Sequence, residues 1–254
     1  MSANSLGKIK TQIKRYTNNP WGRALVILLW VFVGYFIAQA MTVGLVWVLT
    51  RFGVSFAEWG IAVISAVFSA IVYLLSLLIV VGVPWILKRR VTSRKELGLQ
   101  RLPSWLDIGL APAGFVVYLV GSVILLAVMT TLLPSIDADQ VQQNGFENIG
   151  QRYEYVLAFA TLVLIAPLAE EVLFRGYLYG KIRTKVPIWV AILAVSALFA
   201  VVHGQWNVAI DVFALSIVLC ILREVTGSIW SGILLHMLKN GVAFYFLFIN
   251  PLIV

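Results

Sequence analysis

Long apolar runs, separated by short polar segments, dominate this chain of 254 residues. The runs cover residues 24–50, 59–87, 105–133, 155–180, 187–203, 208–222 and 229–249. A helix needs roughly 20 consecutive apolar residues to cross the hydrocarbon core of a bilayer. The pattern therefore predicts an all-α, polytopic membrane protein with about seven transmembrane helices, of which the sixth is short.

The first apolar run has a competing interpretation as a secretory signal peptide. Ala38-Gln39-Ala40 resembles a signal-peptidase cleavage site. The apolar run nevertheless continues beyond that site to Thr50, which makes it long enough to span a membrane. A transmembrane helix is the preferred prediction.

The placement of charge predicts the orientation of the chain. The composition is 61% hydrophobic and 12% charged, with a formal net charge of +8. Basic residues gather beside apolar runs instead of forming one stripe, which argues against a nucleic-acid partner. Fifteen of the nineteen basic residues lie in 1–23, in 88–101, in 181–185 and at Arg223, all of which are predicted on one side of the membrane. The 134–154 loop, predicted on the other side, is acidic. The positive-inside rule then places the amino terminus in the cytoplasm and the carboxyl terminus outside.

Three regions follow from this layout. Residues 1–23 form a basic cytoplasmic leader, 24–150 the N-terminal transmembrane helices, and 151–254 the helices that carry the candidate chemistry. The leader and 88–101 are expected to lie against anionic lipid headgroups. No convincing internal repeat is present, which argues against an inverted-repeat transporter.

Three charged residues interrupt the fourth run, at Glu170, Glu171 and Arg175. A carboxylate at the centre of a membrane helix costs roughly 2.5–3.5 kcal/mol on insertion scales. Glu171 and Arg175 are four positions apart and can pair on one helical face. Glu170 is rotated by about 100° and must find partners on another helix. A purely structural ion-pair network is the alternative for an isolated pair.

Both histidines of the chain also lie in predicted membrane segments. His203 closes the fifth run, and His236 shares a helical face with Asn240 in the seventh. A single intramembrane histidine often serves only as a hydrogen-bond donor between helices. At about 1.5 Å per residue, Glu170 and His236 reach similar depths, whereas His203 requires a fifth helix that starts late, tilts or bends.

These side chains form a consistent hydrolytic site if they converge on a polar intramembrane chamber. Shielding from bulk water makes Glu170 a stronger base, which together with His203 would hold and deprotonate a water molecule. His236 and Asn240 would donate N–H groups to the developing oxyanion. Glu171 and Arg175 would lock the helix and tune the electric field. No serine or cysteine nucleophile is needed.

The three motifs, in this order on successive spans, resemble those of the CPBP family of intramembrane glutamate proteases. They are Glu170-Glu171-x-x-x-Arg175, Phe199-x-x-x-His203 and His236-x-x-x-Asn240. The family, also called Abi, includes type II CAAX prenyl endopeptidases and bacteriocin-processing or immunity proteins. The resemblance covers roughly Tyr155–Gly241, including the turn Arg223–Trp230. It implies that Glu170 is the catalytic glutamate, that His203 helps to activate water, and that His236 and Asn240 form the oxyanion hole.

Two further residues within this part of the chain, Lys239 and Cys220, bear on the prediction. Lys239 is a cation next to Asn240. It is expected to pair with Asp211 or Glu171, or to extend to the membrane–water interface. If it paired with Glu170 instead, it would neutralise the proposed base and argue against activity. The lone Cys220 cannot form an internal disulfide and is expected to be a small buried hydrophobe.

The predicted function is metal-independent intramembrane endopeptidase activity without a cofactor, in a plasma membrane of prokaryotic type. The substrate would be a membrane protein or a lipidated peptide, in contact with the lipid bilayer. A zinc protease ranks lower because the H-E-x-x-H helix is absent, and a rhomboid-like protease because Ser231 lacks the Gly-x-Ser pattern. The non-enzymatic alternatives are a membrane scaffold or immunity protein and a proton-coupled transporter.

Overall fold

The computed structural model describes residues 19–56, 58–89, 91–135, 145–147 and 149–250. All regular secondary structure in these ranges is helical, which confirms the predicted all-α, polytopic membrane class. Five helical segments are long and apolar enough to cross a membrane: Pro20–Arg51, Ile61–Leu87, Trp105–Leu132, Arg152–Ile182 and Trp230–Ile249. The predictions made for most of the basic leader and for part of the acidic 134–154 loop lie outside the described residues.

The helices follow one another along the chain, and the connection between α6 and α7 is the longest. The N-terminal half contains α2 (Pro20–Arg51), α3 (Ile61–Leu77), η1 (Leu78–Gly82), α4 (Val83–Lys88), α5 (Arg94–Leu97) and α6 (Trp105–Leu132). The fourth span consists of α7 (Arg152–Phe159), η2 (Ala160–Ile165), α8 (Ala166–Glu170), η3 (Glu171–Tyr179) and α9 (Gly180–Ile182). The last helices are α10 (Ile188–Val201), α11 (Trp206–Thr226), α12 (Trp230–Phe244) and η4 (Tyr245–Ile249).

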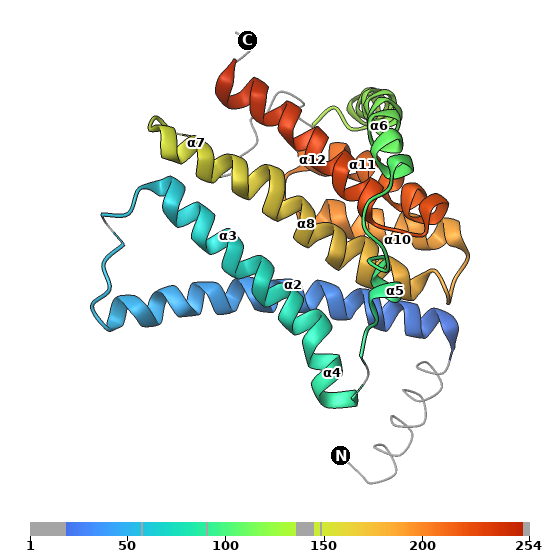
Figure 1. Cartoon of the computed structure of the whole chain (residues 1–254), viewed down its shortest axis with the longest axis horizontal. Coiled ribbons are helices and arrows are strands. Elements are labelled where there is room, and N and C mark those ends of the chain that lie inside the picture. Colours follow the sequence, from blue (N-terminus) through green and yellow to red (C-terminus); the bar gives the residue numbers. More distant parts are fainter. Residues whose placement is uncertain (1–18, 57, 90, 136–144, 148, 251–254) are drawn as a thin grey trace.

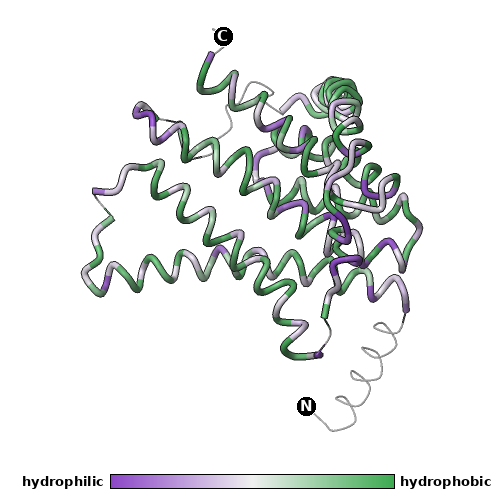
Figure 2. Tube along the Cα trace, viewed as in Figure 1, coloured by the Kyte–Doolittle hydropathy of each residue, from purple (hydrophilic) through white to green (hydrophobic). Residues whose placement is uncertain are grey.

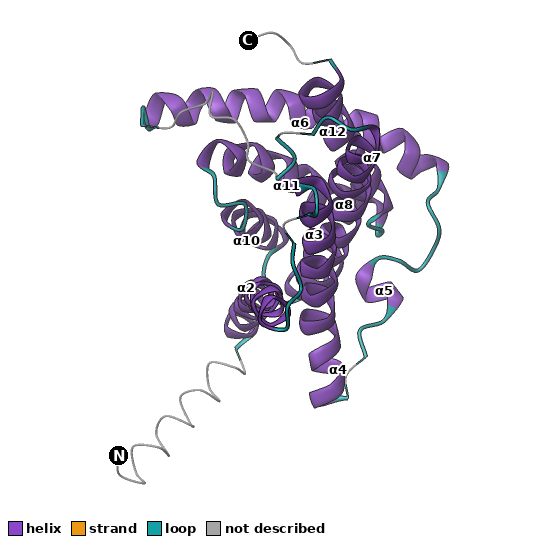
Figure 3. Ribbon diagram, turned by 90° about the vertical axis from the view of Figure 1, so that its left-hand side faces the viewer, coloured by secondary structure: helices purple, strands orange, loops and turns teal. Residues whose placement is uncertain are grey.

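The fourth span lies at the centre of the bundle. The α7–α8 rod runs diagonally between α3 on one side and α12 on the other, and it contacts both (Figure 1). In the view turned by 90°, α10 lies between α2 and α11, and α6 lies beyond α11 (Figure 3). The helices are mostly hydrophobic along their length, with hydrophilic stretches at their ends and a few within the bundle (Figure 2). These inner stretches include the candidate site.

The fourth span changes its hydrogen-bonding pattern on both sides of the short helix α8. Segments η2 and η3 are π-helical, and Pro167 lies in the first turn of α8. Proline has no N–H, and its ring clashes with the carbonyl four residues before it, which favours a wider turn there. Pro167 therefore accounts for η2. The charged motif lies at the junction of α8 and η3.

Helix α10 is shorter than the predicted fifth span. It has 14 residues and ends at Val201, which gives a length of about 21 Å. The chain turns immediately afterwards, where Gly204 has a φ of +73°, a left-handed conformation that favours glycine. His203 therefore lies in a turn after the helix. The depth of His203 in the membrane is set by a helix shorter than predicted, which ends two residues before it.

The predicted end of the sixth helix, at Leu222, is wrong. Helix α11 has 21 residues and includes Arg223 and Glu224, which the sequence pattern had placed in a turn. Glu224 accepts hydrogen bonds from the hydroxyl of Tyr179 at 2.6 Å and from Arg183 Nη2 at 2.5 Å. The helix continues because its charged end has partners within the protein. It stops where Gly227 adopts a φ of +65°.

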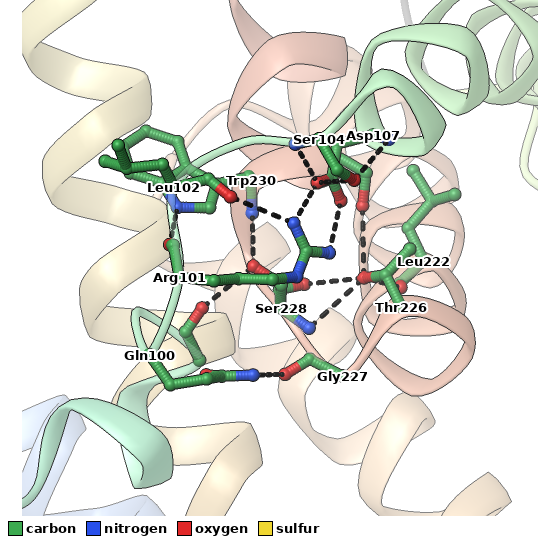
Figure 4. A network of polar contacts seen from close by, with 12 residues as sticks. Gln100, Arg101, Leu102, Ser104, Asp107, Leu222, Thr226, Gly227, Ser228 and Trp230 are labelled. Atoms are coloured by element: carbon green, nitrogen blue, oxygen red, sulfur yellow. Dashed lines mark hydrogen bonds and ion pairs between the residues drawn. The ribbon is translucent and has the colours of Figure 1, made fainter.

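The basic segment between α4 and α6 is fixed to the turn between α11 and α12 (Figure 4). Arg101 pairs with Asp107, and this hydrogen bond raises the pKa of the Arg101 guanidinium above its ordinary value. The Trp230 indole N–H donates to the Arg101 carbonyl at 2.7 Å, and Gln100 donates to the Gly227 carbonyl at 3.0 Å. These bonds fix the start of α12, and so the depth at which His236 lies.

Candidate functional site

Four of the predicted site residues line one cavity of about 280 Å³. They are Glu170 at the end of α8, His203 in the turn after α10, and His236 and Asn240 on α12. Three separate motifs thus meet, as the chamber hypothesis requires. The catalytic roles assigned to these residues remain predictions.

Glu170 has partners on two other helices. The hydroxyl of Tyr73, on α3, donates to Glu170 Oε1 at 2.7 Å. Glu170 Oε2 lies 3.9 Å from His236 Nε2, and the Glu170 side chain is 13% exposed. One carboxylate oxygen is therefore held by a hydrogen bond, and the other faces the imidazole.

Glu171 and Arg175 form the predicted pair, with Arg175 Nη1 donating to Glu171 Oε1 at 3.0 Å. Both side chains are fully buried. The same oxygen lies 3.1 Å from His236 Nδ1. An ionised carboxylate can only accept, so the hydrogen on this side of the ring belongs to Nδ1. Glu171 thereby orients His236 and turns Nε2 towards Glu170.

Phe199 packs against residues of all three motifs. The guanidinium of Arg175 lies over its ring at 4.2 Å from the centroid, a cation–π contact. Its ring centroid is 4.8 Å from that of His203 and 6.1 Å from that of His236. This buried ring fixes the spacing between the ion pair and the two histidines.

His203 and Asn240 are each anchored to backbone carbonyls. His203 Nδ1 lies 2.7 Å from the Phe199 carbonyl oxygen, the carbonyl one helical turn before it. Asn240 Nδ2 donates to the Leu162 carbonyl in η2 at 2.8 Å. The Asn240 bond links α12 to the π-helical part of the fourth span and leaves the second amide hydrogen for another acceptor.

Lys239 pairs with Asp211, one of the partners predicted for it, at 3.2 Å. Asp211 also accepts hydrogen bonds from Tyr118 at 2.5 Å and from Ser122 at 2.9 Å, both on α6. This cluster provides an acidic partner for the ammonium group at the edge of the cavity. Glu170 has Tyr73 and His236 as its partners among the described residues.

Two tyrosines of the cavity were not predicted from the sequence. Tyr35 on α2 and Tyr73 on α3 line the cavity together with the motif residues. Both lie within apolar runs that the sequence distinguished only by hydropathy. Tyrosine is common near membrane interfaces, so its occurrence there gave no signal. Cys220, in contrast, is buried as predicted.

Residues 152–242 match the family described as "Type II CAAX prenyl endopeptidase Rce1-like". The matched residues include all three motifs, in agreement with the family resemblance that these motifs carry. The chain is also similar to an "Uncharacterized 24.3 kDa protein" of Escherichia coli, with 29% identity over 89 residues, which are 33% of this chain and 41% of the relative. The aligned region is thus less than half of that relative. No solved structure matches the chain.

Among the described residues, no group of three or more His, Cys, Asp or Glu side chains has an arrangement that could hold a metal ion. His236 lies between two carboxylates, with Nε2 towards Glu170 and Nδ1 towards Glu171. The arrangement offers a carboxylate, an imidazole oriented by a second carboxylate, and an amide to whatever occupies the cavity.

Proposed function

We propose that this protein is an intramembrane endopeptidase that hydrolyses a peptide bond with a water molecule activated by Glu170. One observation carries the proposal: Glu170 Oε2 faces His236 Nε2 at 3.9 Å inside a cavity that His203 and Asn240 also line. The family match over the same residues supports it.

In the proposed reaction, Glu170 Oε2 accepts a proton from water while the oxygen forms a bond to the carbonyl carbon of the substrate. His203 helps to hold that water. The carbonyl π electrons move to oxygen and produce a tetrahedral oxyanion. Its collapse breaks the C–N bond, and the proton held by Glu170 passes to the leaving amine. The base is thereby regenerated, and one water is consumed for each bond.

The oxyanion would be stabilised by His236 Nε2–H and by the second amide hydrogen of Asn240. In this proposal His236 donates from both nitrogens, from Nδ1–H to Glu171 and from Nε2–H to the oxyanion. A ring that donates from both nitrogens is an imidazolium. Carboxylates lie beside both nitrogens of the ring. Removal of one such donor from an oxyanion hole typically lowers kcat by about 10²–10³.

Glu171 and Arg175 act in this proposal as positioning residues. Their pair lies behind His236, away from the reacting atoms, and Phe199 packs over the guanidinium. The pair would keep His236 Nε2 directed at the cavity throughout the reaction. The substrate would be a membrane protein or a lipidated peptide, because the cavity lies among apolar spans.

The orientation proposed is an amino terminus in the cytoplasm and a carboxyl terminus outside, from the placement of basic segments. Single cysteines introduced near each terminus of a Cys220→Ser protein, labelled in intact cells by an impermeant reagent, test it. Only the carboxyl-terminal cysteine should react. Labelling of the amino-terminal one would contradict the orientation.

Activity is tested with purified protein in liposomes. The probes are a farnesylated Cys-aliphatic-aliphatic-X peptide, its non-prenylated form and a pool of apolar transmembrane peptides, analysed by mass spectrometry. Wild type should cleave at least one probe, and Glu170→Gln, which is nearly isosteric, should cleave none. Equal cleavage by the two proteins, or no cleavage by wild type, would favour a scaffold or transporter.

A further inference from the structure

Tyr73, on the N-terminal helix α3, contacts the proposed base directly. Its hydroxyl donates to Glu170 Oε1 at 2.7 Å across the α3–α8 contact. It lies outside residues 152–242, where the family match and all three motifs are found. The cavity is therefore completed by a side chain that the motifs do not include.

The hydrogen bond has a definite geometric effect on the carboxylate. A carboxylate can rotate about its last side-chain bond and exchange its two oxygens. Tyr73 holds Oε1, so Oε2 remains directed at His236, 3.9 Å away. A general base must present one particular oxygen to the proton it accepts, and freedom to rotate lowers the fraction of time spent in that position.

Tyr73 also separates two cavities. Its side chain lines the 280 Å³ cavity of the site, and it lines a second cavity of about 790 Å³ between α3 and the fourth span. The second cavity has mainly apolar walls such as Leu77, Leu168 and Val172, with Arg94 and Arg101 at its edge. The ring therefore forms part of the wall that keeps the polar site apart from this apolar space.

We infer that Tyr73 is a positioning residue for Glu170, which fixes the rotation of the carboxylate and so selects Oε2 as the oxygen that accepts the proton. The inference rests on the proposed function for its catalytic consequence. Its structural part, a hydroxyl that stabilises the ionised and oriented carboxylate, can be tested without any substrate.

The chain offers a matched control for the test. Tyr153 lies at the start of α7, in the same span as Glu170, and its side chain is exposed and does not line the site cavity. Tyr73→Phe and Tyr153→Phe each remove one hydroxyl and keep the ring, so the wall between the cavities is preserved in both. The two variants differ in whether the lost hydroxyl was bonded to Glu170.

The kinetic test uses a peptide that wild type cleaves. Tyr73→Phe should lower kcat about 10- to 100-fold with KM unchanged, the range typical when a group that orients a reacting residue is lost. The acidic limb of its pH–rate profile should move to higher pH, because the lost donor had favoured the ionised carboxylate. Tyr153→Phe should leave kcat within about twofold of wild type and the acidic limb of its pH–rate profile in place.

The second test needs no substrate. Infrared difference spectra record the carboxylic C=O band of Glu170, identified as the band that Glu170→Gln abolishes, as the pH is lowered. The titratable groups around Glu170 are Tyr35 on α2, Tyr73 on α3, His203 after α10, and His236 and Lys239 on α12. Replacing Tyr73 alone by Phe should make the band appear at higher pH than in wild type.

The outcomes separate the two proposals. An unshifted band in Tyr73→Phe, or the same shift in Tyr153→Phe, would overturn the inference whatever the enzyme does. Wild-type kcat in Tyr73→Phe, with Glu170→Gln inactive, would also overturn it and leave the proposed function intact. A shifted band in a protein that cleaves no probe would support the positioning role and contradict the proposed function.

Discussion

The N-terminal and C-terminal helices of this protein differ in what they bury. In the most apolar 18-residue stretches of the first three spans, 22%, 11% and 6% of residues are buried within the protein, against 44% for the fourth span and 28% for the last. The fourth span and α12 face other helices with polar side chains, whereas α2, α3 and α6 direct most of their surface outwards. The candidate site residues therefore lie mainly on the spans that are most buried by other helices.

The N-terminal helices nevertheless reach the site through a few polar contacts. Tyr73 on α3 bonds to Glu170, and Tyr118 on α6 bonds to Asp211, the partner of Lys239. The first three spans therefore do more than surround the other helices with apolar surface. They supply single hydroxyl groups that orient charged residues carried by the last four helices.

The largest expected effect comes from the site itself. Glu170→Ala, His203→Ala and His236→Ala should each abolish cleavage, because each removes a group from the proposed reaction, while membrane insertion remains intact. Quantified cleavage of a probe peptide and carbonate-resistant membrane association measure the two properties. Loss of insertion would show that the residues serve the fold.

Arg175→Ala should damage folding as well as activity. It leaves Glu171 fully buried without its guanidinium partner, and breaking a buried pair in this way typically costs about 3–5 kcal/mol. The yield of monodisperse protein in detergent and its thermal midpoint should both fall. The double variant Glu171→Gln/Arg175→Met, which removes both charges, should recover much of the stability while activity stays low. A single variant as stable as wild type would argue that the pair contributes nothing to the fold.

Asp211→Asn tests the contact between α6 and the last helices. It deprives Lys239 of its carboxylate partner at the edge of the cavity, where Glu170 is an alternative acidic partner. We expect cleavage to fall by about tenfold, equivalent to about 1.4 kcal/mol. Asp211→Asn/Lys239→Met should restore it, because the released cation is then absent. A double variant as impaired as the single one would mean that Asp211 acts by another route.

Trp230→Phe should have the smallest effect. It removes the indole N–H that bonds to the Arg101 carbonyl and keeps an aromatic ring. One such hydrogen bond contributes about 1 kcal/mol, so the thermal midpoint should fall by a few degrees with cleavage nearly unchanged. Trp189→Phe, at an exposed tryptophan on α10, is the control and should leave the midpoint within experimental error. A large loss of activity in Trp230→Phe would show that the segment between α4 and α6 does more than fix the position of α12.

The sequence predicted most of the fold because hydrophobic runs determine membrane helices directly. Its error at α11 has a physical cause. Arg223 and Glu224 look like a loop when only hydropathy is considered, yet Arg183 and Tyr179 satisfy Glu224 within the protein. Contacts between residues so distant in the chain leave no local pattern that could have extended the helix.

The candidate site was predictable where its residues are charged or are histidines, since such residues are costly in a membrane and require a reason. The Glu171–Arg175 pair follows from helical spacing alone. Tyr73 could not be found in the same way, because a tyrosine in an apolar run is ordinary. Its role depends on the packing of α3 against α8, which hydropathy does not specify.

The central claim is that Glu170 activates water for direct attack on the peptide bond. A single turnover in H₂¹⁸O, with enzyme in excess over a cleavable peptide, tests it directly. The account predicts one ¹⁸O atom at the new carboxyl terminus of the product, none in Glu170, and no product with Glu170→Gln. Product without ¹⁸O, label within Glu170, or equal product from Glu170→Gln would contradict it.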